Sequence, residues 1–235
     1  MLERKPSQST HHPNGDSHRR LWSVARAIKH YGTELIDPFP YRRYMRKHQC
    51  IFIHIPKAAG TSIRSNLGAL SKTRDHFGYD VYQAYNPIRF ECYFKFSFVR
   101  NPWDRLVSVY EYLRQGGNGK SDSALSEQVR MYGTFNQFAN NVLTGQGTQL
   151  IKLLRPQVSY LCNPEGELMV DFVGRFESLE ADFRHVTRVL KIKGSIEHLN
   201  KGTARDFREY YDDDTIELVQ RTYSADVELF NYRFE

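Results

Sequence analysis

Residues 50–62, Cys-Ile-Phe-Ile-His-Ile-Pro-Lys-Ala-Ala-Gly-Thr-Ser, contain the side chains best suited to chemistry in this chain. An apolar run that is typical of a buried strand ends at Pro56, and a short turn with Lys57 and Gly60 follows it. A predicted helix then begins with Thr61–Ser62. An ammonium group, hydroxyl groups and free backbone N–H groups at the start of a helix all favour an anion. The sequence therefore predicts a phosphate cradle at this turn.

The order of residues in this cradle differs from that of an ATP-binding loop. A Walker A loop places its lysine after the last glycine and directly before Ser or Thr. In this chain Lys57 comes first and Gly60 follows it. The cradle is therefore related to a P-loop but lacks the ATPase signature.

A second stretch, residues 98–110, has the same arrangement, in which a strand end with a cationic residue is followed by a helix start. A predicted strand ends at Arg100, and the pair Asn101–Pro102 forms a favourable helix start. Ser108 lies two turns further along this helix. P-loop NTPases use an aspartate near a second strand to help hold Mg²⁺. A fixed arginine at such a position suits a second phosphate, bound without metal.

The elements that must position these residues alternate between strands and helices. The pattern predicts strands over residues 50–55, 92–99 and 168–175. It predicts helices over residues 61–70, 102–113, 124–142, 178–191 and 212–230, whereas residues 71–90 are mixed and turn-rich. This alternation predicts an α/β fold of the P-loop-like, three-layer kind, with a central parallel sheet flanked by helices.

Composition limits the classes of partner. The chain of 235 residues is long enough for one sizeable domain, and its formal charge is +6. Residues 1–50 hold ten Lys/Arg and four Asp/Glu, whereas residues 51–235 hold 23 of each. The basic excess therefore lies outside the predicted domain, which argues against nucleic acid as a partner. The three cysteines are widely spaced without a Cys-x-x-Cys pair, so we expect neither a disulfide framework nor a metal site.

The N-terminal segment, residues 1–47, differs from the domain predicted over residues 48–235. Residues 1–18 are polar and are predicted to be disordered. Residues 20–36 show helical spacing, which fits either a helix packed on the main domain or peripheral contact with an anionic membrane. No stretch approaches the roughly 18 apolar residues that would span a bilayer. We expect a cytoplasmic protein, with membrane association left open and no indication of the oligomeric state.

Two motifs together resemble the signatures of sulfotransferases that use 3′-phosphoadenosine 5′-phosphosulfate (PAPS). They are Ile55-Pro-Lys-x-x-Gly-Thr-Ser62 and Phe98-Val-Arg-Asn-Pro-x-x-Arg-x-x-Ser108. The best match is the carbohydrate sulfotransferase branch, which includes chondroitin and heparan sulfate enzymes and short bacterial members. The resemblance extends over about residues 48–235 through further runs at 155–161, 173–179, 199–202 and 210–213. It implies transfer of a sulfuryl group from PAPS to a hydroxyl of a saccharide or glycolipid acceptor.

The resemblance also implies which residues hold PAPS. It places around the 5′-phosphosulfate the loop Pro56, Lys57, Ala58, Ala59, Gly60, Thr61 and Ser62. Lys57 would also neutralise charge on the bridging oxygen as the S–O bond breaks, which makes it catalytic. Arg100 and Ser108 would bind the 3′-phosphate, where Arg105 either assists or pairs with an acidic residue. Lys201 would close over the nucleotide.

Sulfuryl transfer to a hydroxyl also needs a proton acceptor, which contributes about 10²–10⁴ in rate. His76 lies between the two phosphate motifs, the interval in which related carbohydrate sulfotransferases often carry their catalytic histidine. We predict that His76 is the general base. His54 lies inside the first strand and is interpreted as a hydrogen-bonded structural histidine. Asp75 and Glu111 are weaker substitutes.

Two other functions remain open from the sequence. A P-loop kinase acting on a small molecule would bind ATP and need Mg²⁺, but the loop order and Arg100 oppose it. A non-catalytic nucleotide-binding module would lack the general base. Nothing in the sequence identifies the acceptor, because the loops that would choose it carry no transferable motif. Gln157 and Tyr160 could line an acceptor pocket, or they could have turn or packing roles.

Overall fold

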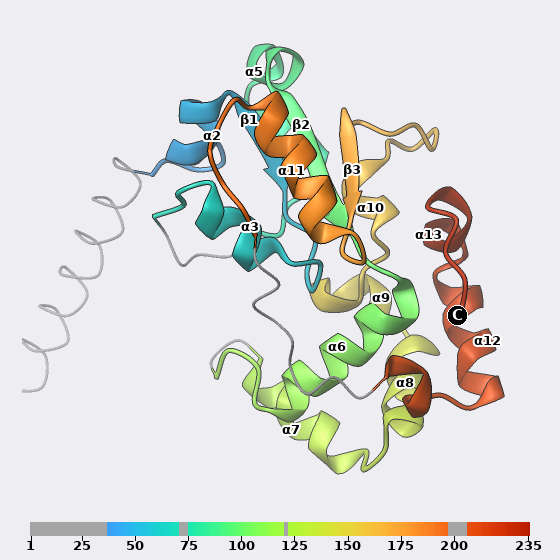
Figure 1. Cartoon of the computed structure of the whole chain (residues 1–235). Coiled ribbons are helices and arrows are strands. Elements are labelled where there is room, and N and C mark those ends of the chain that lie inside the picture. Colours follow the sequence, from blue (N-terminus) through green and yellow to red (C-terminus); the bar gives the residue numbers. More distant parts are fainter. Residues whose placement is uncertain (1–36, 71–74, 120–121, 197–205) are drawn as a thin grey trace, which may run out of the picture. The chain divides into compact units, whose positions relative to one another are not determined.

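The structure is a computed structural model of the chain, shown in Figure 1. It describes residues 37–70, 75–119, 122–196 and 206–235. The predictions made for residues 1–36, and the role expected of Lys201, lie outside these residues. The chain divides into two units, Met1–Phe39 and Pro40–Glu235, and the second contains every strand and helix described below.

The second unit begins before the boundary that the sequence predicts at residue 48. Helix α2 (Arg43–His48) ends at that boundary, and the Tyr41 side chain ahead of it is buried. The Tyr41 hydroxyl donates a hydrogen bond to the Tyr82 carbonyl oxygen at 2.8 Å. The folded unit therefore includes residues 40–47, because burial of an aromatic ring there anchors the chain to the core.

Among the described residues, three parallel strands form the central sheet in the order β1 (Cys50–Ile53), β2 (Phe94–Val99) and β3 (Phe172–Arg175). Every residue of β1 is buried, as expected of a parallel strand that is covered on both faces. Gly174 of β3 pairs with Phe98 of β2, and a Cβ atom at Gly174 would lie 2.5 Å from the Phe98 ring. The sheet confirms the predicted α/β class with a central parallel sheet flanked by helices.

Helix α11 lies across one face of the sheet, and α6 follows directly where β2 ends (Figure 1). The helices after α2 are α3 (Gly60–Asn66), α4 (Tyr79–Tyr85), α5 (Pro87–Cys92), α6 (Pro102–Arg114), α7 (Ser123–Met131), α8 (Phe135–Leu143), α9 (Gly147–Leu150), η1 (Lys152–Leu154), α10 (Val158–Leu161), α11 (Leu179–Val189), η2 (Phe207–Tyr210), α12 (Asp213–Thr222) and α13 (Ser224–Leu229). Within the described ranges, no helix combines the length and the apolar character that a membrane span requires.

Three parts of the helical pattern differ from the prediction. The helix predicted over residues 212–230 is divided into α12 and α13, with Tyr223 between them. The helix predicted over residues 124–142 is divided into α7 and α8, because Gly133 adopts a left-handed φ of 74° and Thr134 then caps α8. Residues 71–90, predicted to be mixed and turn-rich, contain α4 and the start of α5, which Asn86 caps. The last two differences arise where a capping residue lies inside the stretch.

The start of α6 is as predicted. The Asn101 side chain accepts a hydrogen bond from the Trp103 N–H at 3.1 Å, and Pro102 is the first helical residue. The helix buries Trp103 and Leu106 against the core. This cap fixes the direction in which the chain leaves β2, directly after Arg100.

Candidate functional site

The residues beyond the carboxyl ends of β1 and β2 surround a cavity of about 470 Å³. The predicted site residues that line it are Pro56, Lys57, Ala59, Gly60, Thr61, Ser62, His76, Arg100 and Ser108. Ala58 is buried next to them and does not line the cavity. The volume lies within the range of small-molecule sites, about 300–1,000 Å³. The structure therefore brings both predicted anion motifs and the predicted general base to one cavity.

The turn between β1 and α3 holds two residues in the left-handed region. Lys57 has a φ of 67° and Ala59 has a φ of 60°, although neither is glycine. Such a conformation costs of order 1–3 kcal/mol per residue and persists only where the surroundings determine it. Ala58 between them is 1% exposed and packs in the core. The turn thereby places the Lys57 side chain against the cavity.

Gly60 begins α3 at a point where the buried His54 ring lies against the helix. A Cβ atom at Gly60 would fall 1.8 Å from His54 Cδ2 and 2.0 Å from His54 Nε2. Real Cβ atoms essentially never approach other heavy atoms so closely, so His54, which directly follows β1, and helix α3 meet at a distance that only glycine permits.

We expect Gly60→Ala to lower the free energy of unfolding by about 1–3 kcal/mol, because the new methyl group forces the His54 ring or the first turn of α3 to move. Urea denaturation measures this change. Gly145→Ala is the matched control, since a Cβ atom at Gly145 meets nothing within 4 Å. Equal stability of Gly60→Ala and the control would contradict the close approach.

Tyr112 of α6 contacts the catalytic lysine expected from the sequence. The Lys57 Nζ atom lies 4.4 Å from the centre of the Tyr112 ring, a cation–π distance. The Tyr112 hydroxyl donates to an Asp122 carboxylate oxygen at 2.7 Å. The sequence reasoning missed Tyr112, although it follows Ser108 by four residues and so lies on the same face of the helix.

Arg100 connects the two anion motifs. Its Nε and Nη2 donate to the two Asp104 oxygens at 2.7 Å each, and its Nη1 donates to the Lys57 carbonyl oxygen at 3.3 Å. The guanidinium carbon lies 3.9 Å from the centre of the Phe176 ring, which follows β3 and was also missed. Each Nη atom carries a second hydrogen that can bind a ligand oxygen. The guanidinium is therefore held in a fixed orientation at the cavity.

The structure does not bring Arg105 to the cavity, so the expectation that it assists phosphate binding is corrected. Its side chain is 2% exposed, and its Nη atoms donate to the carbonyl oxygens of Leu153 at 3.4 Å and Arg155 at 2.7 Å. Arg105 lies on the inward face of α6 and holds the segment that contains η1. Leu153 in this segment lines the cavity.

The two histidines lie in contact at the cavity, with ring centres 4.3 Å apart. His76 Nδ1 lies 2.9 Å from the His54 carbonyl oxygen. A carbonyl oxygen can only accept, so Nδ1 carries the hydrogen and the neutral ring has its lone pair on Nε2. This tautomer suits a general base that accepts a proton at Nε2. The His54 side chain is 4% exposed and packs against Gly60, and the hydrogen-bonded structural role expected of it stays a prediction.

The two acidic residues considered as substitute bases are engaged in ion pairs. The Asp75 carboxylate accepts from Arg42 Nε at 2.7 Å and Nη2 at 3.1 Å, and Asp75 does not line the cavity. Glu111 does line it, but its oxygens accept from the Tyr210 hydroxyl at 3.1 Å and from Arg114 at 3.1 Å. The Arg42–Asp75 pair therefore anchors the backbone directly before His76.

We expect Asp75→Asn to lower the free energy of unfolding by about 3 kcal/mol, because it leaves the Arg42 guanidinium buried without its counter-charge. The side chains of this pair are only 5% and 10% exposed. The matched control is Glu180→Gln in the exposed pair with Arg184, which should change stability little. Thermal and urea unfolding compare the two variants, and equal effects would show that burial of the first pair is unimportant.

Gln157 and Tyr160 pack in the interior and do not line the cavity. Gln157 is fully buried at 0% exposure, and Tyr160 is 2% exposed. Burial raises the pKa of the Tyr160 hydroxyl, which donates to the Lys152 carbonyl oxygen at 2.9 Å. Of the two interpretations that the sequence left open for these residues, the structure therefore favours packing. Within the described residues, no group of three or more His, Cys, Asp or Glu side chains is arranged to hold a metal ion.

Comparison with known proteins gives one family match and several relatives. The pattern of the family described as "Sulfotransferase family" matches residues 43–233. Carbohydrate sulfotransferase 8 of Mus musculus is 26% identical over 229 residues, covering 79% of this chain and 55% of that protein. Carbohydrate sulfotransferase 9 of Homo sapiens is 23% identical over 250 residues, covering 87% of this chain and 56% of that protein.

Carbohydrate sulfotransferase 14 of Mus musculus is 32% identical over 114 residues, which are 42% of this chain and 29% of that protein. The chain thus spans about half the length of the curated relatives that it matches over most of its own length. No solved structure matches the chain.

Proposed function

This chain belongs to the sulfotransferase family, and from that premise we propose that it transfers a sulfuryl group from PAPS to a hydroxyl of a carbohydrate or glycolipid acceptor. The observation that carries the proposal is the single cavity at which Lys57, Arg100 and His76 meet. The first two residues supply fixed positive charge, and the third supplies a nitrogen that can accept a proton. These are the groups required for transfer to a hydroxyl from a nucleotide with two anionic groups.

In the proposed reaction, PAPS supplies an activated sulfuryl group on its 5′-phosphate. The acceptor oxygen forms a bond to sulfur as the bond between sulfur and the phosphate oxygen breaks. The products are a sulfate ester and adenosine 3′,5′-bisphosphate. The proton of the acceptor hydroxyl passes to Nε2 of His76, so the mass and charge of the reaction balance.

Lys57 has two tasks in this proposal. With Thr61 and Ser62 it binds the 5′-phosphosulfate, and its ammonium group stabilises the negative charge that develops on the leaving phosphate oxygen. The Tyr112 ring limits the positions that the Lys57 Nζ atom can take, because the two are 4.4 Å apart. A charge that is already in place costs no reorganisation during the reaction.

Arg100 and Ser108 bind the 3′-phosphate in this proposal. Both line the cavity, and Arg100 retains hydrogens on both Nη atoms for phosphate oxygens. The names of the relatives support a saccharide as acceptor. Cytoplasmic localisation, and membrane contact through residues 20–36, stay predictions.

Nucleotide binding tests this proposal. Titration calorimetry of the full chain with adenosine 3′,5′-bisphosphate, in the presence of EDTA, should show tight binding that added Mg²⁺ does not change. ATP should bind more weakly, because it lacks the 3′-phosphate. Mg²⁺-dependent binding of ATP with no binding of the bisphosphate would instead support the kinase.

A further inference from the structure

The backbone of Arg100 is held by a buried side chain that does not reach the cavity. Gln157 Oε1 accepts from the Arg100 N–H at 2.9 Å, and Gln157 Nε2 donates to the Arg100 carbonyl oxygen at 2.8 Å. Arg100 is the first residue beyond the end of β2, whose pairing with β3 ends at Val99. The Gln157 amide therefore satisfies both backbone groups of Arg100, as a neighbouring strand would.

Gln157 is itself fixed by a buried carboxylate from the C-terminal part of the chain. The Asp226 oxygens accept from the N–H groups of Gln157 and Val158 at 2.8 Å each. Asp226 has 0% exposure, and burial raises the pKa of its carboxyl group, although Arg105 and the two N–H groups oppose this rise. A continuous chain of hydrogen bonds thus runs from α13 through Gln157 to Arg100.

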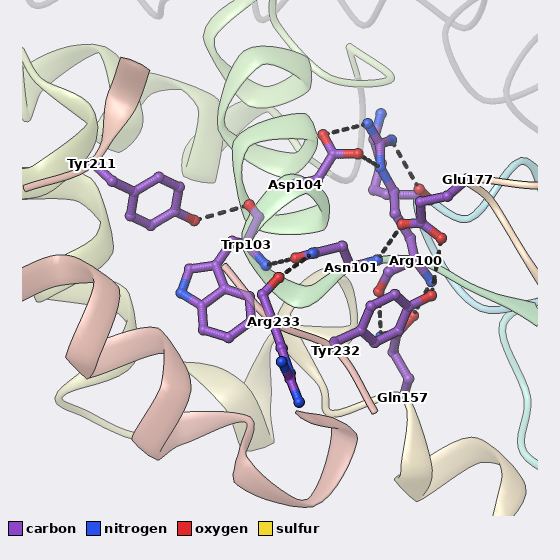
Figure 2. Close-up of polar contacts among 10 residues, drawn as sticks. Arg100, Asn101, Trp103, Asp104, Gln157, Glu177, Tyr211, Tyr232 and Arg233 are labelled. Carbon is purple, nitrogen blue, oxygen red and sulfur yellow. Dashed lines mark hydrogen bonds and ion pairs between the residues drawn. The ribbon is translucent and has the colours of Figure 1, made fainter. Parts of the chain in front are cut away.

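The residue after Arg100 is tied to the same end of the chain. Glu177 accepts from the Asn101 N–H at 2.6 Å and from the Tyr232 hydroxyl at 3.0 Å (Figure 2). The Asn101 side chain donates to the Arg233 carbonyl oxygen at 2.9 Å. The turn that carries Arg100 is therefore held by residues that do not line the cavity, and its guanidinium is held by Asp104.

We propose that Gln157 is a positioning residue for Arg100: its amide, fixed by Asp226, sets the direction in which the Arg100 guanidinium meets the 3′-phosphate. This inference rests on the proposed function. A buried amide is costly unless its groups are satisfied, and here both bonds go to one residue of the site. Without the amide, the Arg100 backbone can rotate, so the guanidinium no longer meets the phosphate in one geometry.

The test compares two nucleotides that differ only in the 3′-phosphate. Calorimetry gives the dissociation constants of adenosine 5′-phosphate and adenosine 3′,5′-bisphosphate. The first constant divided by the second is the ratio that reports the contribution of the 3′-phosphate. In the full chain, we expect Gln157→Met to reduce this ratio about tenfold, which is the usual scale for a lost charge-assisted hydrogen bond. The affinity for adenosine 5′-phosphate should stay unchanged. Ser159→Ala is the matched control on α10, because Ser159 is exposed and should leave the ratio unchanged.

Gln157→Glu gives a second measurement, the pH dependence of this ratio. This pH dependence should be absent if Gln157 only stabilises the fold. A protonated glutamic acid can still accept from the Arg100 N–H and donate to its carbonyl oxygen, whereas the carboxylate repels that oxygen. The ratio of the two dissociation constants in Gln157→Glu, divided by the same ratio in the parent at the same pH, should therefore rise as the pH falls. Gln157→Met should show no such rise.

Two outcomes separate the inference from the proposed function. A parent protein that binds both nucleotides equally would overturn the proposed role of Arg100, and the inference with it. A parent that prefers the bisphosphate, with the same ratio in Gln157→Met and no pH-dependent recovery in Gln157→Glu, would overturn the positioning role alone.

Discussion

Lys57→Met is expected to lower kcat for sulfuryl transfer by about 10²–10³-fold, the usual loss when one preorganised group that stabilises developing charge is removed. Methionine keeps much of the length of the side chain but has no charge. The Lys57 ammonium acts mainly on the leaving oxygen, where negative charge grows in the transition state. We therefore expect kcat to fall more than the affinity for adenosine 3′,5′-bisphosphate.

Of the lysines that the structure describes, only Lys57 lines the cavity. Lys57 is placed by its left-handed backbone and by the ring of Tyr112. Lys193→Met removes an exposed lysine that does not line the cavity and serves as the control. Steady-state rates of product formation compare the variants. An unchanged kcat in Lys57→Met would contradict the proposed mechanism.

His76→Asn is expected to lower kcat by about 10²–10⁴-fold, because the variant has no nitrogen that can accept the proton of the acceptor hydroxyl. The asparagine amide can still donate to the His54 carbonyl oxygen, as Nδ1 of His76 does. In the parent, the rate should fall at acid pH, since a protonated imidazole cannot accept another proton. This fall should be absent in His76→Asn.

His54→Asn tests the other histidine of the pair. The His54 ring lies against Gly60, so removal of this ring should weaken nucleotide binding. The decrease of the transfer rate at acid pH should remain. His185→Asn changes an exposed histidine of α11 and should leave the profile unchanged. If the acid fall disappeared in His54→Asn and remained in His76→Asn, the two roles would have to be exchanged.

The parts of the site that the sequence predicts correctly depend on local signals. Lys57 and Arg100 each follow an apolar strand and precede a helix start, so the residues that meet at the ends of parallel strands can be identified from short stretches. The Asn101 cap and the start of α3 are also predicted from residues next to them in the sequence. The central parallel sheet follows from the alternation of strands and helices.

The contacts that the sequence could not predict join residues that are far apart in the chain. Gln157 looks like any polar residue of a loop, and only the fold shows that it binds the backbone of Arg100 and that Asp226 holds it in turn. The sequence leaves Arg105 open between assisting at the 3′-phosphate and pairing with an acidic residue. The true partners of Arg105 are carbonyl oxygens of the segment 152–155, which local periodicity cannot reveal.

One measurement tests the central claim most directly. The full chain is incubated with PAPS labelled in its sulfuryl group, in EDTA, with a panel of saccharides and glycolipids. We predict that label appears in a saccharide or glycolipid, that adenosine 3′,5′-bisphosphate forms in equal amount, and that Lys57→Met makes product about 10²–10³-fold more slowly. The account would be contradicted if no acceptor gained label while Mg²⁺ and ATP gave a phosphorylated product, or if Lys57→Met transferred sulfate at the parent rate.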